Sequence, residues 1–229
     1  MNLSTIPVVR LVIQQLLNYG VHHIVIAPGS RNAPITVGLT THKAFTTYSI
    51  VDERSAGFFA IGLSQQLHQP VAVLCTSGSA LLNIYPAVSE AYYSRYPLVV
   101  ISADRPTYQI DIGNGQTIRQ SGVFSKHLIS ETSLLQDITH NQSAIIESNT
   151  QQLIDVQSTL QEVESQQKTI EKNNTKYLQK VLSEMLSQQG PVHVNIPLEE
   201  PLYDFHDQND FVVERVKQPK NPQPKNLES

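Results

Sequence analysis

Cysteine is almost absent from this sequence, since Cys75 is the only one among 229 residues. A lone cysteine excludes an internal disulfide framework and favours a reducing compartment. No apolar stretch approaches the roughly 20 residues that cross a bilayer. Residues 1–4 lack the charged start and apolar core of a signal peptide. We therefore expect a cytoplasmic protein without a membrane segment.

Charge is also sparse. Charged residues make up 16% of the chain and the net charge is −4. The lysines and arginines are scattered and form no basic stripe, which excludes an electrostatic case for nucleic acid. A chain of this length with 40% hydrophobic residues is long enough for one sizeable core with an appendage.

What the sequence does have is four apolar runs that each stop at a polar loop, and each loop opens toward a predicted helix. The runs and their loops are 22–26 with 27–32, 48–51 with 52–54, 71–74 with 75–79, and 98–101 with 102–106. Strands that alternate with helices in this way indicate repeated βαβ units. Near-continuous apolar runs are typical of strands covered by helices on both faces. We expect a three-layer α/β/α fold with a mostly parallel sheet of about six strands.

Periodicity and capping residues predict the individual elements. We expect helices at 5–19 (capped by Ser4), 34–42, 53–67, 79–93 and 174–189 (capped by Asn173 or Asn174), and strands at 22–26, 45–51, 70–75, 97–102, 134–138 and 192–196. The Gln-rich stretch 149–173 predicts a peripheral helix. Residues 1–206 then form the domain, and 207–229 form a polar, proline-containing linker or tail.

Ligands of open parallel sheets sit outside the carboxyl ends of the strands. The pattern therefore places five side chains along one edge: Ser30, Arg31, Glu53, Ser77 and Arg105. Glu53 has two interpretations. It is either a partly desolvated carboxylate with a raised pKa, able to share a proton with a ring nitrogen, or a first-turn glutamate that favours the helix dipole. Spacing alone favours the second.

The two arginines indicate an anionic small-molecule ligand, because guanidinium groups match carboxylates and phosphates. Each also has a structural interpretation: Arg31 pairs with a surface acid, and Arg105 pairs with the adjacent Asp104. The sequence Thr-Ser-Gly-Ser-Ala at 76–80 looks like a phosphate cradle, although it matches neither the P-loop nor the GxGxxG pattern. A tight strand-to-helix turn that needs Gly78 explains it equally.

Other polar residues point to no further chemistry. The eight histidines are not spaced as a metal site, so we expect no metal ligands. Cys75 reads as a small buried hydrophobe. The Gly-rich segment within 107–126 is either a flexible surface loop or an active-site loop.

Five short motifs resemble a known family. They are Ile-Ala-Pro-Gly-Ser-Arg at 26–31, Asp-Glu-Arg at 52–54, Thr-Ser-Gly-Ser at 76–79, Ala-Asp-Arg-Pro at 103–106 and Gln-Thr-Ile-Arg-Gln at 116–120. Together they resemble the N-terminal pyrimidine-binding domain of thiamine-diphosphate enzymes. Within that family the chain is most similar to the SEPHCHC synthases of menaquinone biosynthesis, the MenD group. The resemblance covers about residues 5–205.

The resemblance implies an enzyme that decarboxylates 2-oxoglutarate on thiamine diphosphate and adds the product carbanion to isochorismate. Glu53 then hydrogen-bonds N1′ of the aminopyrimidine and supports removal of the C2 proton. Thr76, Gly78 and Asn83 match positions that line the pyrimidine pocket. The positions that match those used for the carboxylated substrates are Ser30, Arg31, Arg105 and Gln116.

Full-length family members continue into a middle domain and a diphosphate-binding domain, which holds Mg²⁺. We expect both domains to be absent here. The chain then holds half of a site that a partner subunit's diphosphate-binding domain completes in a homo-oligomer, and it is inactive alone. Two alternatives remain open: the pyrimidine-binding domain of another thiamine-diphosphate 2-oxoacid enzyme, and a non-catalytic binding or dimerisation module.

Overall fold

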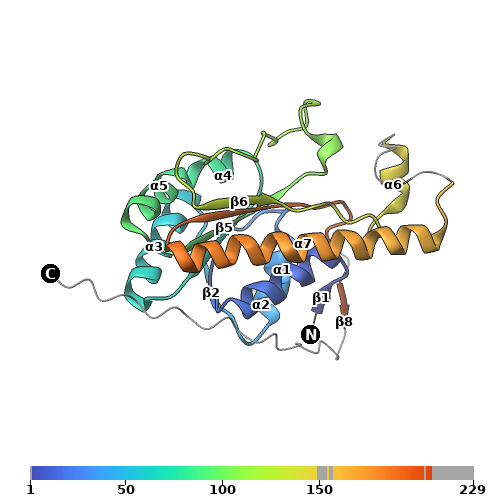
Figure 1. Ribbon diagram of the computed structural model, residues 1–229. Helices are drawn as coiled ribbons and strands as arrows, with labels where there is room; N and C mark the ends of the chain where they lie inside the picture. The colour runs from blue at the N-terminus through green and yellow to red at the C-terminus, as the bar shows by residue number, and fades with distance from the viewer. Residues whose placement is uncertain (1, 149–153, 155–156, 204, 208–229) are drawn as a thin grey trace.

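A six-stranded parallel sheet forms the centre of the protein, shown in Figure 1 as a computed structural model. The structure describes residues 2–148, 154, 157–203 and 205–207. The strand order is β3-β2-β4-β5-β7-β6, and every neighbouring pair is parallel. The strands are β2 (His23–Ile26), β3 (Thr46–Ser49), β4 (Val71–Cys75), β5 (Leu98–Asp104), β6 (Ser130–Ser133) and β7 (Val192–Pro197).

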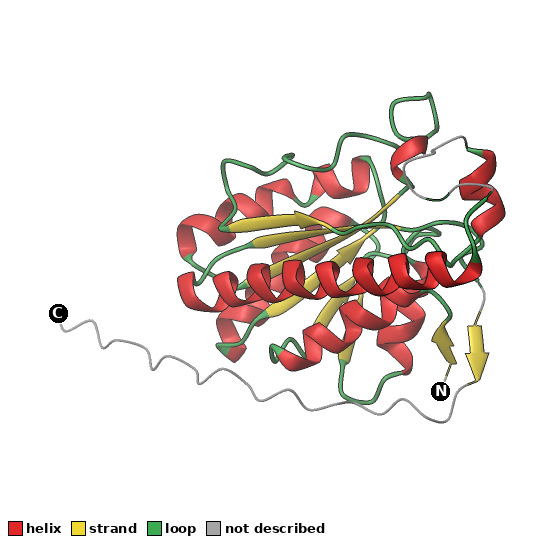
Figure 2. Cartoon of the chain, turned by 45° about the vertical axis from the view of Figure 1, so that its right-hand side comes forward, coloured by secondary structure: helices red, strands yellow, loops and turns green. Residues whose placement is uncertain are grey.

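Helices cover both faces of this sheet, which confirms the predicted three-layer fold. The helices that cover the sheet are α1 (Pro7–Asn18), α2 (Ala33–Thr41), α3 (Glu53–Leu67), α4 (Ser79–Asn83), α5 (Tyr85–Ser94) and α7 (Leu160–Gln188). The short helix α6 (Gln142–Glu147) lies beyond one end of the sheet in Figure 1, and the 3-10 helix η1 (Thr107–Gln109) follows β5 in sequence. Figure 2 shows the helices on either side of the strands.

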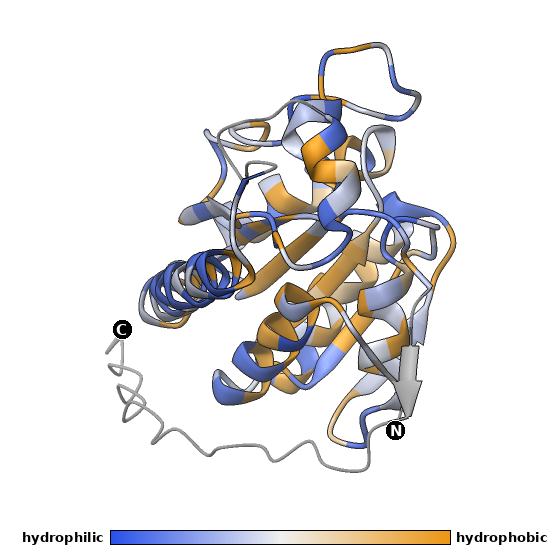
Figure 3. Cartoon of the chain, turned by 90° about the vertical axis from the view of Figure 1, so that its right-hand side faces the viewer, coloured by the Kyte–Doolittle hydropathy of each residue, from blue (hydrophilic) through white to orange (hydrophobic). Residues whose placement is uncertain are grey.

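Alternate strand side chains divide the core into two halves. Ile24 and Leu74 pack with α1, α2 and α7, whereas Val25 and Val73 pack with α3, α4 and α5. Figure 3 shows the central strands among the most hydrophobic parts of the chain. Because both strand faces are buried, β2, β4 and β5 have the near-continuous apolar runs from which they were predicted.

The start of α1 differs from the prediction. Ser4 is not the helix cap but the last residue of β1 (Asn2–Ser4), which pairs with β8 (Phe205–Asp207) in a separate antiparallel sheet. The helix begins after Ile6, which gives no side-chain cap. Instead, Asp137 Oδ2 accepts a 2.8 Å hydrogen bond from the Val8 amide. The cap therefore comes from a residue that is distant in sequence.

The predicted helix 79–93 is two helices that meet at Ile84. Pro86 lies in the first turn of α5, where a proline needs no amide partner within the helix. A proline at this point does not sustain the hydrogen-bond ladder of the preceding helix, so α4 is only five residues long.

The predicted strand at 134–138 is wrong. The strand is β6, immediately before it, and its sequence is Ser-Glu-Thr-Ser. β6 lies at the sheet edge with β7 as its one neighbour in the sheet, so its burial does not demand an apolar run. The apolar residues that follow leave the sheet and pack under α7.

The predicted helix cap at Asn173 or Asn174 is also wrong. Both residues lie inside α7, a single helix of 29 residues that begins with a capping box between Thr159 and Glu162. Asn174 is buried because its side chain pairs with the backbone of Leu135, accepting from its amide at 2.8 Å and donating to its carbonyl at 2.9 Å. Of the predicted peripheral helix 149–173, the part from Leu160 belongs to α7, and residues 149–153, 155 and 156 lie outside the described residues.

The predicted tail also falls mostly outside the described residues, which end at Asp207, the last residue of β8. The proposed domain boundary at residue 206 therefore stays a prediction. Among the helices that the structure describes, none is both long and apolar enough to cross a membrane.

Candidate functional site

The order in which the chain adds strands to the sheet reverses at β2. From β2 the chain passes through α2 to β3 on one side, and then through α3 to β4 on the other side of β2. The loops that follow β2 and β4 therefore lie next to each other at the carboxyl edge, the position at which open α/β sheets bind ligands. A Cβ on Gly29 would lie 2.7 Å from Thr76 Cβ, so glycine is what permits this close approach.

A buried asparagine closes the loop after β2. Asn32 donates from Nδ2 to the Ala27 carbonyl at 2.8 Å, and its Oδ1 accepts from the Gly29 amide at 2.9 Å. The loop thereby holds Ser30 exposed and Arg31 half-buried at the sheet edge. Sequence reasoning missed Asn32, although an asparagine two residues after a Gly-Ser pair is a recognisable loop-closing residue.

Arg31 has two hydrogen-bond partners among the residues that the structure describes. Its Nη1 donates to the Leu198 carbonyl at 3.1 Å, and its Nη2 donates to Glu200 Oε1 at 2.9 Å. The side chain of Arg31 is 10% exposed, whereas that of Glu200 is 64% exposed. Glu200 is the surface acid that the structural interpretation of Arg31 required.

Arg105 does not use the partner that its sequence suggests. Its Nη1 donates to Ser77 Oγ at 2.8 Å and to the Gln116 carbonyl at 2.9 Å. Asp104 instead accepts from the backbone amide of Arg105 at 2.8 Å. Burial and then the positive charge of Arg31 lower the pKa of Arg105, so the two guanidinium groups are close enough to repel each other.

The loop that contains Gln116 lies against the turn after β4. Ser77 Oγ donates to the Gln116 carbonyl at 2.9 Å, and the Gly78 amide donates to Gln120 Oε1 at 2.8 Å. Gly78 has φ +74°, and a Cβ there would lie 2.7 Å from the same carbonyl of Gln116. The turn therefore needs Gly78, as one interpretation predicted. The Gln116 segment is a loop at the sheet edge rather than a detached surface loop.

Beneath these loops lies a buried polar network that sequence reasoning missed. Gln120 Nε2 donates to Asn195 Oδ1 at 2.6 Å, which also accepts from Ser102 Oγ at 2.8 Å. Asn195 Nδ2 donates to Asp104 Oδ2 at 2.9 Å, and burial raises the pKa of Asp104. The available signal was the presence of polar residues within mostly apolar strands: Ser102 on β5, and His193 and Asn195 on β7.

Glu53 is the first residue of α3, after the cap Asp52, whose Oδ1 accepts from the Ser55 amide at 2.8 Å. Glu53 is half-buried, and its carboxylate accepts no hydrogen bond from the residues that the structure describes. It lies near the end of β4, where burial and then the charge of Glu53 raise the pKa of the buried Cys75 thiol. Cys75 is buried as predicted.

The last predicted site residue is less involved. Asn83 is exposed at the end of α4 and makes no hydrogen bond to these loops within the described chain. The described histidines, cysteine and acids also include no group of three or more placed to hold a metal ion.

Residues 6–131 match the family model described as "Thiamine pyrophosphate enzyme, N-terminal TPP binding domain". The chain belongs to this family. The matched range contains the loops after β2, β4 and β5 and every predicted site residue of this thiamine pyrophosphate enzyme domain. Asn195 and Glu200, which the structure adds to the sheet edge, lie beyond the range.

Curated relatives of this thiamine pyrophosphate enzyme domain share one name, 2-succinyl-5-enolpyruvyl-6-hydroxy-3-cyclohexene-1-carboxylate synthase (SEPHCHC synthase). A protein from Christiangramia forsetii is 48% identical over 205 residues, which are 89% of this chain and 33% of the relative. One from Flavobacterium psychrophilum is 46% identical over 88% of this chain and 31% of the relative. One from Bacteroides fragilis is 42% identical over 82% of this chain and 29% of the relative. The chain thus spans about a third of the length of these relatives.

Proposed function

We propose that this chain is the pyrimidine-binding part of a SEPHCHC synthase, which decarboxylates 2-oxoglutarate and adds the resulting succinyl unit to isochorismate in menaquinone biosynthesis. The names of the relatives support this proposal over another thiamine-diphosphate 2-oxoacid enzyme. The observation that carries it is the half-buried carboxylate of Glu53, which accepts no hydrogen bond from the described residues and lies beside the turn after β4.

Glu53 fits the pyrimidine half of thiamine diphosphate. A carboxylate without a protein partner can hold a proton at a ring nitrogen, and its half-buried position limits competition from water. Thr76 and Gly78 sit in the adjoining turn, where the backbone comes close to the loop after β2. Asn83 is proposed as a further contact at the end of α4. When bound, the cofactor supplies the carbanion chemistry that a 2-oxoacid decarboxylation needs.

Arg31 and Arg105 fit the two substrates. Both 2-oxoglutarate and isochorismate carry two carboxylates, and guanidinium groups bind carboxylates with paired hydrogen bonds. The charge of Arg31 lowers the pKa of Arg105, whereas the charges of Asp104 and Glu200 raise it, so acids of the chain already offset part of the repulsion between the two arginines. A substrate carboxylate between the two guanidinium groups would offset more of it. Ser30 is exposed at the same edge, and Gln116 is held there through its backbone carbonyl. We assign both to substrate binding.

Exposed apolar side chains just before α3, within α3 and on α4 form a surface suited to contact with a partner subunit. Val51 is 78% exposed, and Phe58, Phe59 and Leu82 are each more than 40% exposed. We propose that the diphosphate-binding domain of a second subunit covers this surface in a cytoplasmic homo-oligomer. That domain, outside this chain, holds the diphosphate and Mg²⁺. The chain alone is then inactive, and turnover of both substrates by the chain alone would contradict this.

The test uses a full-length protein that carries this domain, together with its E53Q and D52N variants. Exchange of the thiamine C2 proton is followed by NMR after acid quench. We expect E53Q to lose fast exchange while its circular dichroism spectrum is unchanged. D52N keeps fast exchange, because asparagine caps a helix as well as aspartate does. Unchanged exchange in E53Q, or no cofactor binding by the parent protein, would overturn the proposal.

A further inference from the structure

Glu199 is a buried acid just after β7 to which the proposed function assigns no role. It is 5% exposed. Its Oε2 accepts from the Tyr108 hydroxyl and lies 3.5 Å from Gln136 Nε2. Its Oε1 accepts from the Glu200 amide at 3.0 Å. The three donors come from the segments that follow β5, β6 and β7, so one carboxylate joins three loops at the carboxyl edge of the sheet.

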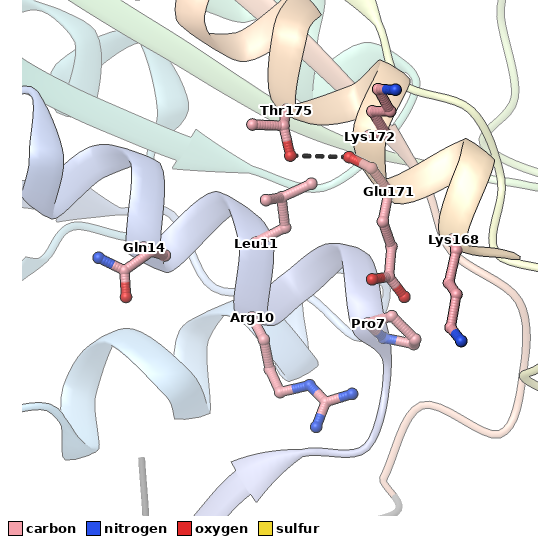
Figure 4. A pocket seen from close by; sticks show the side chains of 8 residues that line it. All are labelled: Pro7, Arg10, Leu11, Gln14, Lys168, Glu171, Lys172 and Thr175. Carbon is pink, nitrogen blue, oxygen red and sulfur yellow. Dashed lines mark hydrogen bonds between the residues drawn. The ribbon is translucent and has the colours of Figure 1, made fainter. Parts of the chain in front are cut away.

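Hydrogen-bond donors, and not a cation, hold this carboxylate. Among the described residues, no lysine, arginine or histidine forms an ion pair with Glu199. Glu171 is in the opposite situation, because it shares the groove between α1 and α7 with three cationic residues, shown in Figure 4: Arg10, Lys168 and Lys172. A buried carboxylate without a countercharge depends on each of its donors. The loss of one donor from Glu199 should therefore be felt in the loop that supplies it.

Tyr108 supplies the donor from the loop after β5. Burial and then the hydrogen bond to Glu199 raise the pKa of Tyr108, so its hydroxyl stays protonated at neutral pH and donates. Tyr108 lies in η1, three residues after Arg105, and residues 111–116 of the same loop are exposed. The Gln116 carbonyl, which accepts from Arg105 Nη1, holds the far end of the loop. The loop is thus attached near both of its ends.

Glu199 also lies within the segment that holds Arg31. Arg31 donates to the Leu198 carbonyl at 3.1 Å and to Glu200 Oε1 at 2.9 Å, and these two residues flank Glu199 in sequence. The Glu199 carboxylate therefore connects the segment bound to Arg31 with the loop that follows Arg105. If the two arginines bind carboxylates, their separation has to match the spacing of the anionic groups on the substrates.

We propose that Tyr108 and Glu199 are positioning residues, and that their hydrogen bond fixes Arg105 relative to Arg31 so that both guanidinium groups reach the substrates. This inference rests on the proposed function and deepens it. Neither Tyr108 nor Glu199 is assigned a contact with substrate. Their effect is carried by the loop after β5 and by the segment after β7.

The attachment is tested first in the chain as it exists. The amides of Gln109 and Ile110 bond to carbonyls three residues earlier, within and just before η1. We expect Y108F to speed hydrogen exchange at both amides about tenfold, as measured by NMR, and to leave the amides of β5 unchanged. Y177F is the matched control, because Tyr177 is 40% exposed and makes no hydrogen bond to the described residues. Unchanged exchange in Y108F, or a rise throughout the chain, would overturn the proposal.

A double-mutant cycle tests whether Tyr108 acts through Glu199. E199M retains the length of the side chain without its oxygens. We expect Y108F to have no further effect on the exchange at η1 in the E199M background, because the tyrosine then has no carboxylate to bind. Additive effects of the two substitutions would show that they act separately, which contradicts the assignment.

Steady-state kinetics of a full-length protein test the consequence for substrate. We expect Y108F to raise KM for at least one of the two dicarboxylates about fivefold, and to leave exchange of the thiamine C2 proton unchanged, because Glu53 lies on α3. Unchanged KM values, or a parallel loss of C2 exchange, would overturn the positioning role. A parent protein that turns over neither substrate contradicts the proposed function instead, and the amide exchange still decides whether Tyr108 anchors the loop.

Discussion

The backbone amide of Gly78 donates a 2.8 Å hydrogen bond to the buried side-chain oxygen of Gln120, 42 positions away in sequence. Gln120 donates in turn to Asn195, on β7. The turn after β4 is therefore fixed from below by a network that crosses β5 and β7. This rigid support keeps the turn in place beside Glu53 and Arg105 before any ligand binds.

Replacing Gln120 with leucine is expected to destabilise the domain. The Gly78 amide then loses its partner, at about 1–3 kcal/mol for a buried group left unpaired, and Asn195 Oδ1 keeps the hydrogen bond from Ser102 Oγ. Q116A is the matched control, because Gln116 is exposed and contributes its backbone carbonyl. It should change the free energy of unfolding by less than about 0.5 kcal/mol. Urea unfolding measures both, and equal losses would show that the network adds no stability.

Replacing Gly78 with alanine is expected to lower the free energy of unfolding by more than the addition of one methyl group would suggest. The residue has φ +74°, and the added Cβ would meet the Gln116 carbonyl at 2.7 Å. The backbone strain alone costs about 1–3 kcal/mol. Gly62 is the control, because a Cβ there has nothing within 4 Å and the residue lies inside α3. G62A should stabilise the protein by about 0.5–1 kcal/mol. Thermal unfolding shows whether each variant is more or less stable than wild type. A stabilising effect of G78A would contradict the interpretation of a strained turn.

Substitutions at Arg31 and at Glu200 are expected to change the KM of the proposed enzyme in opposite directions. In a full-length protein, R31Q should raise KM for 2-oxoglutarate by about tenfold or more, because a charge-assisted contact is lost. E200Q removes the acid that competes for Arg31 and should lower KM. Steady-state kinetics distinguish the two. If E200Q raises KM as much as R31Q does, Glu200 positions Arg31 for substrate rather than competing with it.

The central sheet could be predicted from sequence because β2, β4 and β5 are buried on both faces, and such burial demands an uninterrupted apolar run. The edge strand β6 could not be predicted, because it is only partly buried and so does not need an apolar run. Its apolar neighbours at 134–138 resemble a strand, yet they lie outside the sheet.

The edge positions of Arg31, Glu53 and Arg105 could also be predicted, since they follow from strand ends. Their partners could not. Arg105 contacts Ser77 and Gln116, residues brought together only when β4 and β5 pair. Likewise, Ser102 and Asn195 become neighbours only through the register of β5 and β7. Sequence proximity suggested Asp104 for Arg105, but the carboxylate oxygens of Asp104 accept from the backbone amide of Arg105 and from Asn195 Nδ2 instead.

Asn174 illustrates the same limit and gives a further prediction. Both of its amide hydrogen bonds reach the Leu135 backbone, so N174A leaves two backbone groups of Leu135 unpaired. We expect a loss of about 2–4 kcal/mol in the free energy of unfolding. N173A, one position earlier on α7, should be neutral or slightly stabilising, because alanine is the better helix former. Denaturant unfolding measures the free energy of unfolding of both variants. Equal effects would show that the hydrogen bonds of Asn174 add no stability.

The raised pKa of Asp137 predicts that the free energy of unfolding depends on pH. Burial raises its pKa to about 6 from an ordinary 3.8, and its two oxygens accept from the Val8 amide and from Gln167 Nε2. The folded state therefore binds a proton more tightly than the unfolded state does. The stability that this adds is complete below pH 3.8 and is lost as pH rises through about 6.

The difference in the free energy of unfolding between wild type and D137N isolates this effect. A shift of this size corresponds to at most about 3 kcal/mol. Wild type should lose stability relative to D137N by up to that amount as pH rises from about 4 to 7. D111N changes an exposed carboxylate and should track wild type across the range. Because Asp137 caps α1 and also holds Gln167 of α7, the loss should appear in the amide exchange of both helices. A difference between wild type and D137N that does not vary with pH would mean that Asp137 stays ionised when folded.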